Sequence, residues 1–85
     1  MTNKAELKLY GRTYCHLCDD MLAALETLRG EYSFSVEIFD VDADPALEAK
    51  YDELVPVLEA EGQELCHYFL DAAKVREYLA RFAEK

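Results

Sequence analysis

The sequence predicts a single α/β domain with the element order β-α-β-α-β-β-α and a four-stranded mixed sheet flanked by helices. The 85 residues are enough for one modest hydrophobic core. A strand, a helix and a second strand follow one another with the spacing of a right-handed parallel βαβ unit. A hairpin and an amphipathic helix complete the chain, so we treat residues 1–85 as one domain.

The first strand is predicted over Glu6 to Tyr10, where apolar and polar residues alternate, and Gly11 is expected to break it. From Cys18 to Leu28, apolar residues recur at three- and four-residue spacing, which predicts an amphipathic helix. Gly30 is expected to end this helix in the left-handed conformation.

The second strand is predicted over Tyr32 to Asp40. Its apolar residues share one parity, as expected for one face of a strand: Phe34, Val36 and Ile38. A short helix is then predicted over Pro45 to Tyr51, with Asp44 as its N-cap and proline at its first position.

A β-hairpin is predicted next, with strands over Val57 to Ala60 and Gln63 to Tyr68 and a turn at Glu61-Gly62. Asp71 is expected to cap the last helix. The apolar residues at helical spacing in that helix form its predicted buried stripe: Val75, Tyr78, Leu79 and Phe82.

Charge and hydropathy exclude several functional classes. The formal net charge of −9 is opposite to what a nucleic-acid surface requires. No apolar run approaches the roughly 20 residues of a membrane span, and no signal-peptide pattern is present. We therefore expect a cytoplasmic protein that binds neither nucleic acid nor membrane, and we expect a monomer.

The acidic residues concentrate in the segment 37–64, which contains one basic residue, Lys50. Such a segment is usually a solvated face that keeps the protein in solution. The alternative is a surface that repels anions and selects a basic partner.

The stretch Cys15-His16-Leu17-Cys18 carries the chemistry of the chain. It lies between a predicted strand and a predicted helix, and the unsatisfied N–H groups at a helix N-terminus stabilise a thiolate. Zinc requires four ligands, and only Cys66, His16 and His67 remain as candidates, so thiol–disulfide chemistry is favoured over a metal site.

The element order, the CxxC motif at the first helix and a Val-Pro before the third strand together resemble the thioredoxin fold in its glutaredoxin-sized form. The resemblance is to small bacterial glutaredoxin-like proteins and covers nearly the whole chain. Three stretches carry it: Leu9 to Asp19, Asp40 to Asp42, and Leu54 to Leu58. It implies that Cys15 is the outward nucleophile and Cys18 the inner resolving thiol.

The resemblance also implies a cis Pro56 that faces the cysteine pair and a Val55 backbone that pairs with an extended substrate. Arg12, Tyr14 and His16 are the other expected substrate-binding residues. Arg12 is placed to meet a carboxylate of glutathione, and His16 to act on the neighbouring thiol. Each of the three could instead be an ordinary loop residue.

One stretch departs from the family pattern. Glutaredoxins usually carry a Gly-Gly pair and an acidic residue after the fourth strand, and this segment binds the γ-glutamyl group of glutathione. Here the stretch Leu65 to Asp71 contains no glycine. Glutathione recognition is therefore expected to differ, whereas the dithiol chemistry is not affected.

The function we expect is a small thiol–disulfide oxidoreductase that reduces or exchanges disulfides of proteins or glutathione. No bound cofactor or metal is expected, glutathione is a candidate co-substrate, and a separate reductant must restore the dithiol. The alternative is a thioredoxin-fold binding module, redox sensor or metal-binding protein with little turnover. Cys66 is expected in the core, with a mixed-disulfide role as its alternative.

Overall fold

A computed structural model of the chain describes residues 5–13, 15–51 and 54–81. Within these residues the observed order of elements is the predicted one, and the α/β class is confirmed. The elements are β1 (Ala5–Gly11), α1 (His16–Thr27), β2 (Phe34–Asp40), α2 (Pro45–Tyr51), β3 (Val57–Ala60), β4 (Gln63–His67) and α3 (Ala72–Ala80). Two 3-10 turns, η1 (Leu28–Gly30) and η2 (Val41–Ala43), follow α1 and β2.

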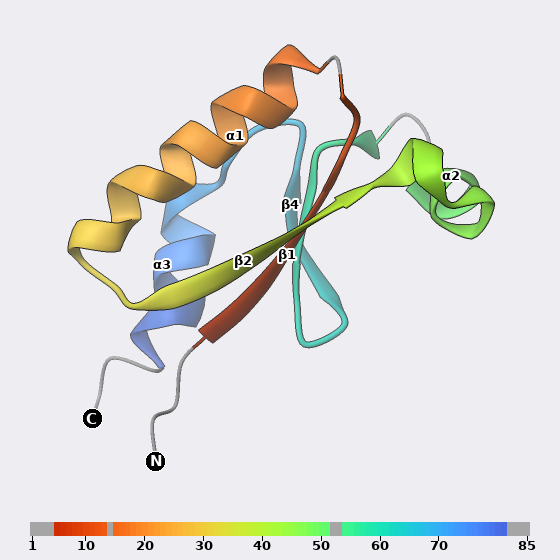
Figure 1. The fold of residues 1–85 in the computed structure, drawn as a ribbon. Helices are drawn as coiled ribbons and strands as arrows, with labels where there is room; N and C mark the ends of the chain where they lie inside the picture. Colours follow the sequence, from red (N-terminus) through yellow and green to blue (C-terminus); the bar gives the residue numbers. More distant parts are fainter. Residues whose placement is uncertain (1–4, 14, 52–53, 82–85) are drawn as a thin grey trace.

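The strands form one four-stranded mixed sheet in the order β2-β1-β3-β4. β1 is parallel to β2 and antiparallel to β3, and β3 is antiparallel to β4. Tyr10 lies opposite Val57, and Val57 lies opposite His67. The end of β1, the start of β3 and the end of β4 therefore meet at one edge of the sheet, where α1 begins (Figure 1).

Helices cover both faces of the sheet. α1 and α3 pack on one face, and α2 lies on the other side, beyond the ends of β1 and β2 (Figure 1). Alternate residues of β1 point to opposite faces, so each face has its own core. The larger core joins β1, β2 and β3 to α1 and α3: Leu7, Leu9, Met21, Leu25, Phe34, Leu58, Val75 and Leu79. The smaller one consists of Tyr10, Val41, Tyr51 and Val57.

The expectation for Gly30 is wrong. α1 ends at Thr27, and the chain then forms the 3-10 turn η1, whose last residue is Gly30. Among the described residues, positive φ angles occur at Glu61, Gly62 and Tyr68. The N–H groups of Glu31 and Tyr32 both bond to the carbonyl of Leu28 at 2.9 Å, so the carbonyl is satisfied without a left-handed residue.

Most of the other boundaries agree with the sequence. The carboxylate of Asp44 accepts the N–H of Ala46 at 2.9 Å, and that of Asp71 accepts the N–H of Lys74 at 3.1 Å, so both predicted caps are confirmed. Gly11 does not break β1 but is its last residue. The predicted contribution of Phe82 to α3 lies outside the described residues. No helix in the described part of the chain is long and apolar enough to cross a membrane.

Candidate functional site

A disulfide joins Cys15 and Cys18 where the loop after β1 enters α1. Their Cα atoms are 5.2 Å apart. Cys15 is the N-cap of α1, with extended backbone angles (φ −141°, ψ 104°), and its Sγ accepts the N–H of Cys18 at 3.1 Å. The sulfur atom thus occupies the position of a capping oxygen, at the positive end of the helix.

The two cysteines differ in exposure. Cys15 is half-buried, whereas Cys18 is buried and 8% exposed. An incoming disulfide can reach the outer sulfur more readily than the inner one. The geometry therefore gives the two sulfurs unequal positions, as the family resemblance implies for a nucleophile and a resolving thiol.

Gly11, the last residue of β1, lies directly against Cys18. A Cβ at position 11 would be 2.7 Å from the Cys18 Sγ and 3.3 Å from its Cβ. Both distances are too short for an ordinary contact, so only a glycine hydrogen fits there without a shift. A glycine at the end of the strand before the CxxC motif was the available signal for this contact.

Pro56 immediately precedes β3, the strand that pairs with β1. Because Tyr10 pairs with Val57 across β1 and β3, the following position, Gly11, is level with Pro56. The Val55–Pro56 peptide bond is cis, Pro56 is buried and Val55 is half-buried. The N–H of Tyr68 donates to the Pro56 carbonyl at 2.9 Å. The segment Val55–Pro56 is therefore fixed at the edge of the sheet that carries the disulfide.

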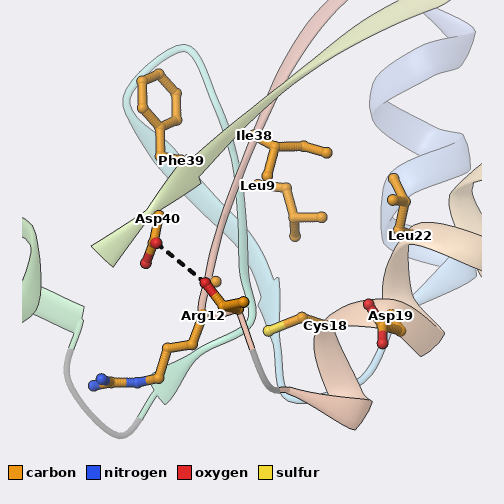
Figure 2. Close-up of a pocket in the computed structure, with 10 residues that line it drawn as sticks. Leu9, Arg12, Cys18, Asp19, Leu22, Ile38, Phe39 and Asp40 are labelled. Carbon is orange, nitrogen blue, oxygen red and sulfur yellow. Dashed lines mark hydrogen bonds between the residues drawn. The ribbon is translucent and has the colours of Figure 1, made fainter. Parts of the chain in front are cut away.

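The other predicted substrate-binding residues are Arg12, His16 and Tyr14. Arg12 makes an ion pair with Asp42, and its guanidinium group points away from Cys18 (Figure 2). His16 is the exposed first residue of α1. Tyr14 lies outside the described residues.

The stretch after β4, where the family pattern has a glycine pair, carries two aromatic residues. Tyr68 has a positive φ of 66° and is 38% exposed, and Phe69 is 68% exposed. Tyr68 thus takes a backbone conformation that glycine adopts most easily. The absence of the glycines is evident in the sequence, but the exposure of aromatic side chains beside Pro56 was not predicted from it.

Cys66 is a free, buried cysteine on β4 and part of the larger core. Burial raises the pKa of its thiol. A buried thiol with a raised pKa is mostly protonated at neutral pH and therefore a poor nucleophile. Cys66 and the Cys15–Cys18 pair are chemically distinct.

A pocket of about 220 Å³ lies behind the buried cysteine, between β2 and α1. Leu9, Leu22 and Ile38 point into the space between these elements, while the ring of Phe39 points to the other side of β2 (Figure 2). Parity in the sequence groups Ile38 with Phe34 and Val36 on one face of the strand and gives no sign of this pocket. The structure has the Ile38 side chain 59% exposed. Ten residues line the pocket: Leu9, Gly11, Arg12, Thr13, Cys18, Asp19, Leu22, Ile38, Phe39 and Asp40.

A buried carboxylate on the opposite face of the sheet was also missed. Glu59 is 8% exposed, and its two oxygens accept the hydroxyl groups of Tyr10 and Tyr51, each at 3.1 Å. The tyrosine rings stack with centroids 4.4 Å apart. One acidic residue in an otherwise apolar strand, Val57 to Ala60, was the signal that could have indicated a buried polar cluster.

The aspartates after β2 form turns and a cap. The Asp40 carboxylate accepts the N–H of Asp42 at 2.9 Å. It also accepts a hydrogen bond from the Thr13 hydroxyl at 3.4 Å, which Figure 2 marks with a dashed line. Across the residues that the structure describes, no group of three or more His, Cys, Asp or Glu side chains is arranged to hold a metal ion.

The fold and the disulfide at the start of α1 define a thioredoxin-fold protein with a CxxC motif. The family model of the Glutaredoxin-like domain (DUF836) matches residues 6–80, and the chain belongs to this family. A protein of Mycobacterium tuberculosis is 26% identical over 84 residues, which cover 93% of this chain and 87% of that one.

Solved structures agree with this assignment. An NMR structure of a Nitrosomonas europaea protein has a TM-score of 0.85 at 41% identity and covers 93% of this chain and 95% of that chain. An X-ray structure from X. campestris has a TM-score of 0.68 at 39% identity, with 88% and 96% covered. A mutant thioredoxin from Halobacterium salinarum has a TM-score of 0.62 at 25% identity, with 98% and 78% covered.

Proposed function

We propose that this protein is a thiol–disulfide oxidoreductase that reduces or exchanges disulfides of proteins or of glutathione. The observation that carries the proposal is the Cys15–Cys18 disulfide at the N-terminus of α1, with the Cys15 Sγ accepting a helix N–H group. This hydrogen bond and the helix dipole both favour the thiolate over the thiol once the disulfide is reduced.

The reaction begins from the reduced pair. The Cys15 thiolate attacks one sulfur of the substrate disulfide, a new Cys15–substrate disulfide forms, and the other substrate sulfur leaves as a thiolate. Cys18 loses its proton and attacks the Cys15 sulfur, which releases the second substrate thiolate and forms the Cys15–Cys18 disulfide. The substrate has then gained two electrons and, after protonation in water, two protons.

A separate thiol reductant must restore the dithiol. Two molecules of a monothiol such as glutathione, or one protein dithiol, supply the two electrons that the Cys15–Cys18 disulfide accepts. We place this activity in the cytoplasm, where such thiols are kept reduced.

Residues around the pair have proposed roles in substrate binding. The backbone at Val55 and Pro56 immediately precedes β3 and is proposed to pair with an extended substrate segment. His16, next to the nucleophile, is proposed to assist proton transfer. Arg12 and Tyr14 are proposed to contribute to binding on the loop between β1 and α1, Arg12 from the position that its ion pair with Asp42 gives it.

The test is the reduction of a neutral small-molecule disulfide by the wild type and by two cysteine variants. Cys15→Ser should abolish turnover, and Cys18→Ser should accumulate a mixed disulfide that mass spectrometry detects. A Cys66→Ala variant is the matched control, because Cys66 is a free cysteine buried in the core and should be dispensable for activity. Full disulfide-reductase activity in Cys15→Ser would contradict the proposal and favour a binding module instead.

A further inference from the structure

The pocket behind Cys18 has the size of a side-chain site. Its volume of about 220 Å³ is far above the roughly 10–15 Å³ that one water requires. It is also below the roughly 300–1,000 Å³ of typical small-molecule sites. It can therefore accept one long side chain of a larger partner.

The lining of the pocket combines an apolar wall with acidic ends. Leu9, Leu22 and Ile38 form the wall, Asp19 lies on the α1 side and Asp40 on the β2 side (Figure 2). Asp19 and Asp40 are both exposed. The two carboxylates therefore place negative charge at both ends of the apolar wall.

The basic residue that lines the pocket does not cancel this charge. The guanidinium of Arg12 is directed away from Cys18 and pairs with Asp42, whose own negative charge balances it (Figure 2). The chain as a whole carries a formal net charge of −9. The pocket is thus complementary to a side chain with an apolar stem and a positive end, which is the chemistry of lysine and arginine.

The position of the pocket relative to Cys15 determines how far along the substrate sequence the basic residue must be from the reactive cysteine. The Cα atoms of Cys15 and Cys18 are 5.2 Å apart, and Cys18 is one of the residues that line the pocket. In an extended chain, side chains two residues apart point the same way and are separated by about 6.5–7 Å. A residue two positions from a cysteine bonded to Cys15 can therefore reach the pocket.

We propose that the pocket behind Cys18 selects disulfide-bearing polypeptides that carry a lysine or arginine two residues from the reactive cysteine. The stem of this side chain packs on Leu22 and Ile38, and its charged end meets Asp19 and Asp40. The inference rests on the proposed function, since it concerns the substrate of the same disulfide.

The test uses symmetric disulfides of a neutral peptide, with one residue type X placed two positions before and after the cysteine. The peptides with X as lysine, norleucine, glutamine and glutamate are each mixed with the pre-reduced protein in a single turnover. We expect the lysine peptide to react about fivefold faster than the glutamine peptide, as for the upper end of an exposed ion pair. The norleucine peptide should fall between them, and the glutamate peptide should be slowest.

Two variants locate the effect. Asp19→Asn should lower the lysine-to-glutamine rate ratio about twofold to threefold. Asp20→Asn is the matched control, because it removes the same charge from the next residue of α1, which does not line the pocket. Using a ratio within each variant removes any general change in cysteine reactivity. A peptide with its lysines moved to the chain ends controls for non-specific attraction to an acidic protein.

The outcomes separate the two proposals. If no peptide is reduced and the neutral small disulfide is not reduced either, the proposed function fails. If the peptides are reduced but the lysine-to-glutamine ratio is near one, the pocket proposal alone is overturned. It is also overturned if Asp20→Asn lowers the ratio as much as Asp19→Asn, or if the peptide with terminal lysines reacts as fast.

Discussion

On the face of the sheet covered by α1 and α3 the buried contacts are mainly apolar, with a partly buried hydrogen bond from Tyr78 to Glu61. On the α2 face a carboxylate and two tyrosine hydroxyls meet inside the fold. Leu25 of α1 is fully buried among other apolar side chains. Glu59 of β3 is buried with a hydrogen bond from a tyrosine to each oxygen. The first arrangement depends on filled volume and the second on matched donors and acceptors, so the two faces should respond differently to substitution and to pH.

The largest effect is expected on the apolar face. Leu25→Ala should lower the free energy of unfolding by about 2–5 kcal/mol, because it removes buried apolar surface and leaves a cavity. This is a large part of the roughly 5–15 kcal/mol of a typical domain. Urea unfolding measures it, and Leu25→Met, which keeps the volume, should cost less than about 1.5 kcal/mol. Equal losses for both variants would show that volume does not govern this face.

Tyr51→Phe probes the polar face at nearly constant volume. It removes the hydroxyl that donates to Glu59 Oε2 at 3.1 Å, so we expect a loss of about 1.5–3 kcal/mol, as for a hydrogen bond to a charged group. The matched double variant Tyr51→Phe/Glu59→Gln removes the buried charge as well and should be less destabilised than the sum of the single variants. Additive losses would mean that the pair does not interact.

Gly11→Ala tests the contact between β1 and the disulfide. The added Cβ would be 2.7 Å from the Cys18 sulfur, and such overpacking should cost about 1–3 kcal/mol in thermal or urea unfolding. Gly30→Ala is the control, since nothing lies within 4 Å of a Cβ there, and it should stay within about 0.5 kcal/mol of the wild type. Unchanged stability in Gly11→Ala would show that Cys18 can shift freely.

The smallest effect is expected in the pH dependence of stability, where the buried tyrosines contribute at alkaline pH. Burial, together with hydrogen bonding to Glu61, raises the pKa of Tyr78 from 10.0 to about 12. A raised pKa in the folded state means that the contribution to stability is complete below pH 10.0 and is lost as pH rises toward 12. Tyr78→Phe should therefore lose less stability than the wild type over this interval.

The same experiment separates the effect of buried tyrosine hydroxyls from that of apolar packing. Burial, followed by hydrogen bonding to Glu59, also raises the pKa of Tyr51, so Tyr51→Phe should flatten the alkaline decline. Leu25→Ala should lower the whole pH profile of unfolding free energy without changing its shape. A change of slope in Leu25→Ala would contradict this separation of apolar packing from the tyrosine hydroxyls.

The features of the fold that depend on neighbouring residues in the sequence were predictable. The Asp44-Pro45 pair placed the start of α2, and Glu61-Gly62 placed the hairpin turn, where both residues have positive φ angles. Asp71 placed the start of α3 in the same way. Caps and turns are formed by residues within a few positions of one another, so a single sequence contains the information.

The features that depend on distant residues were not predictable in the same way. Glu59 is buried because Tyr10 and Tyr51 reach it from residues 49 and 8 positions away. Ile38 has the parity of Phe34, yet it is exposed where Phe34 is buried, and so it lines the pocket behind Cys18. The position of the CxxC motif at a helix start could be predicted, but the pocket beside it required the packing of α1 on the sheet.

The contact between Gly11 and Cys18 links two positions that are seven apart in the sequence. In a library that randomises both, side chains larger than hydrogen at position 11 should survive mainly where position 18 has lost its sulfur. The two sites would then vary together rather than independently. A chain that keeps its inner thiol therefore has one fewer freely variable position in its first strand.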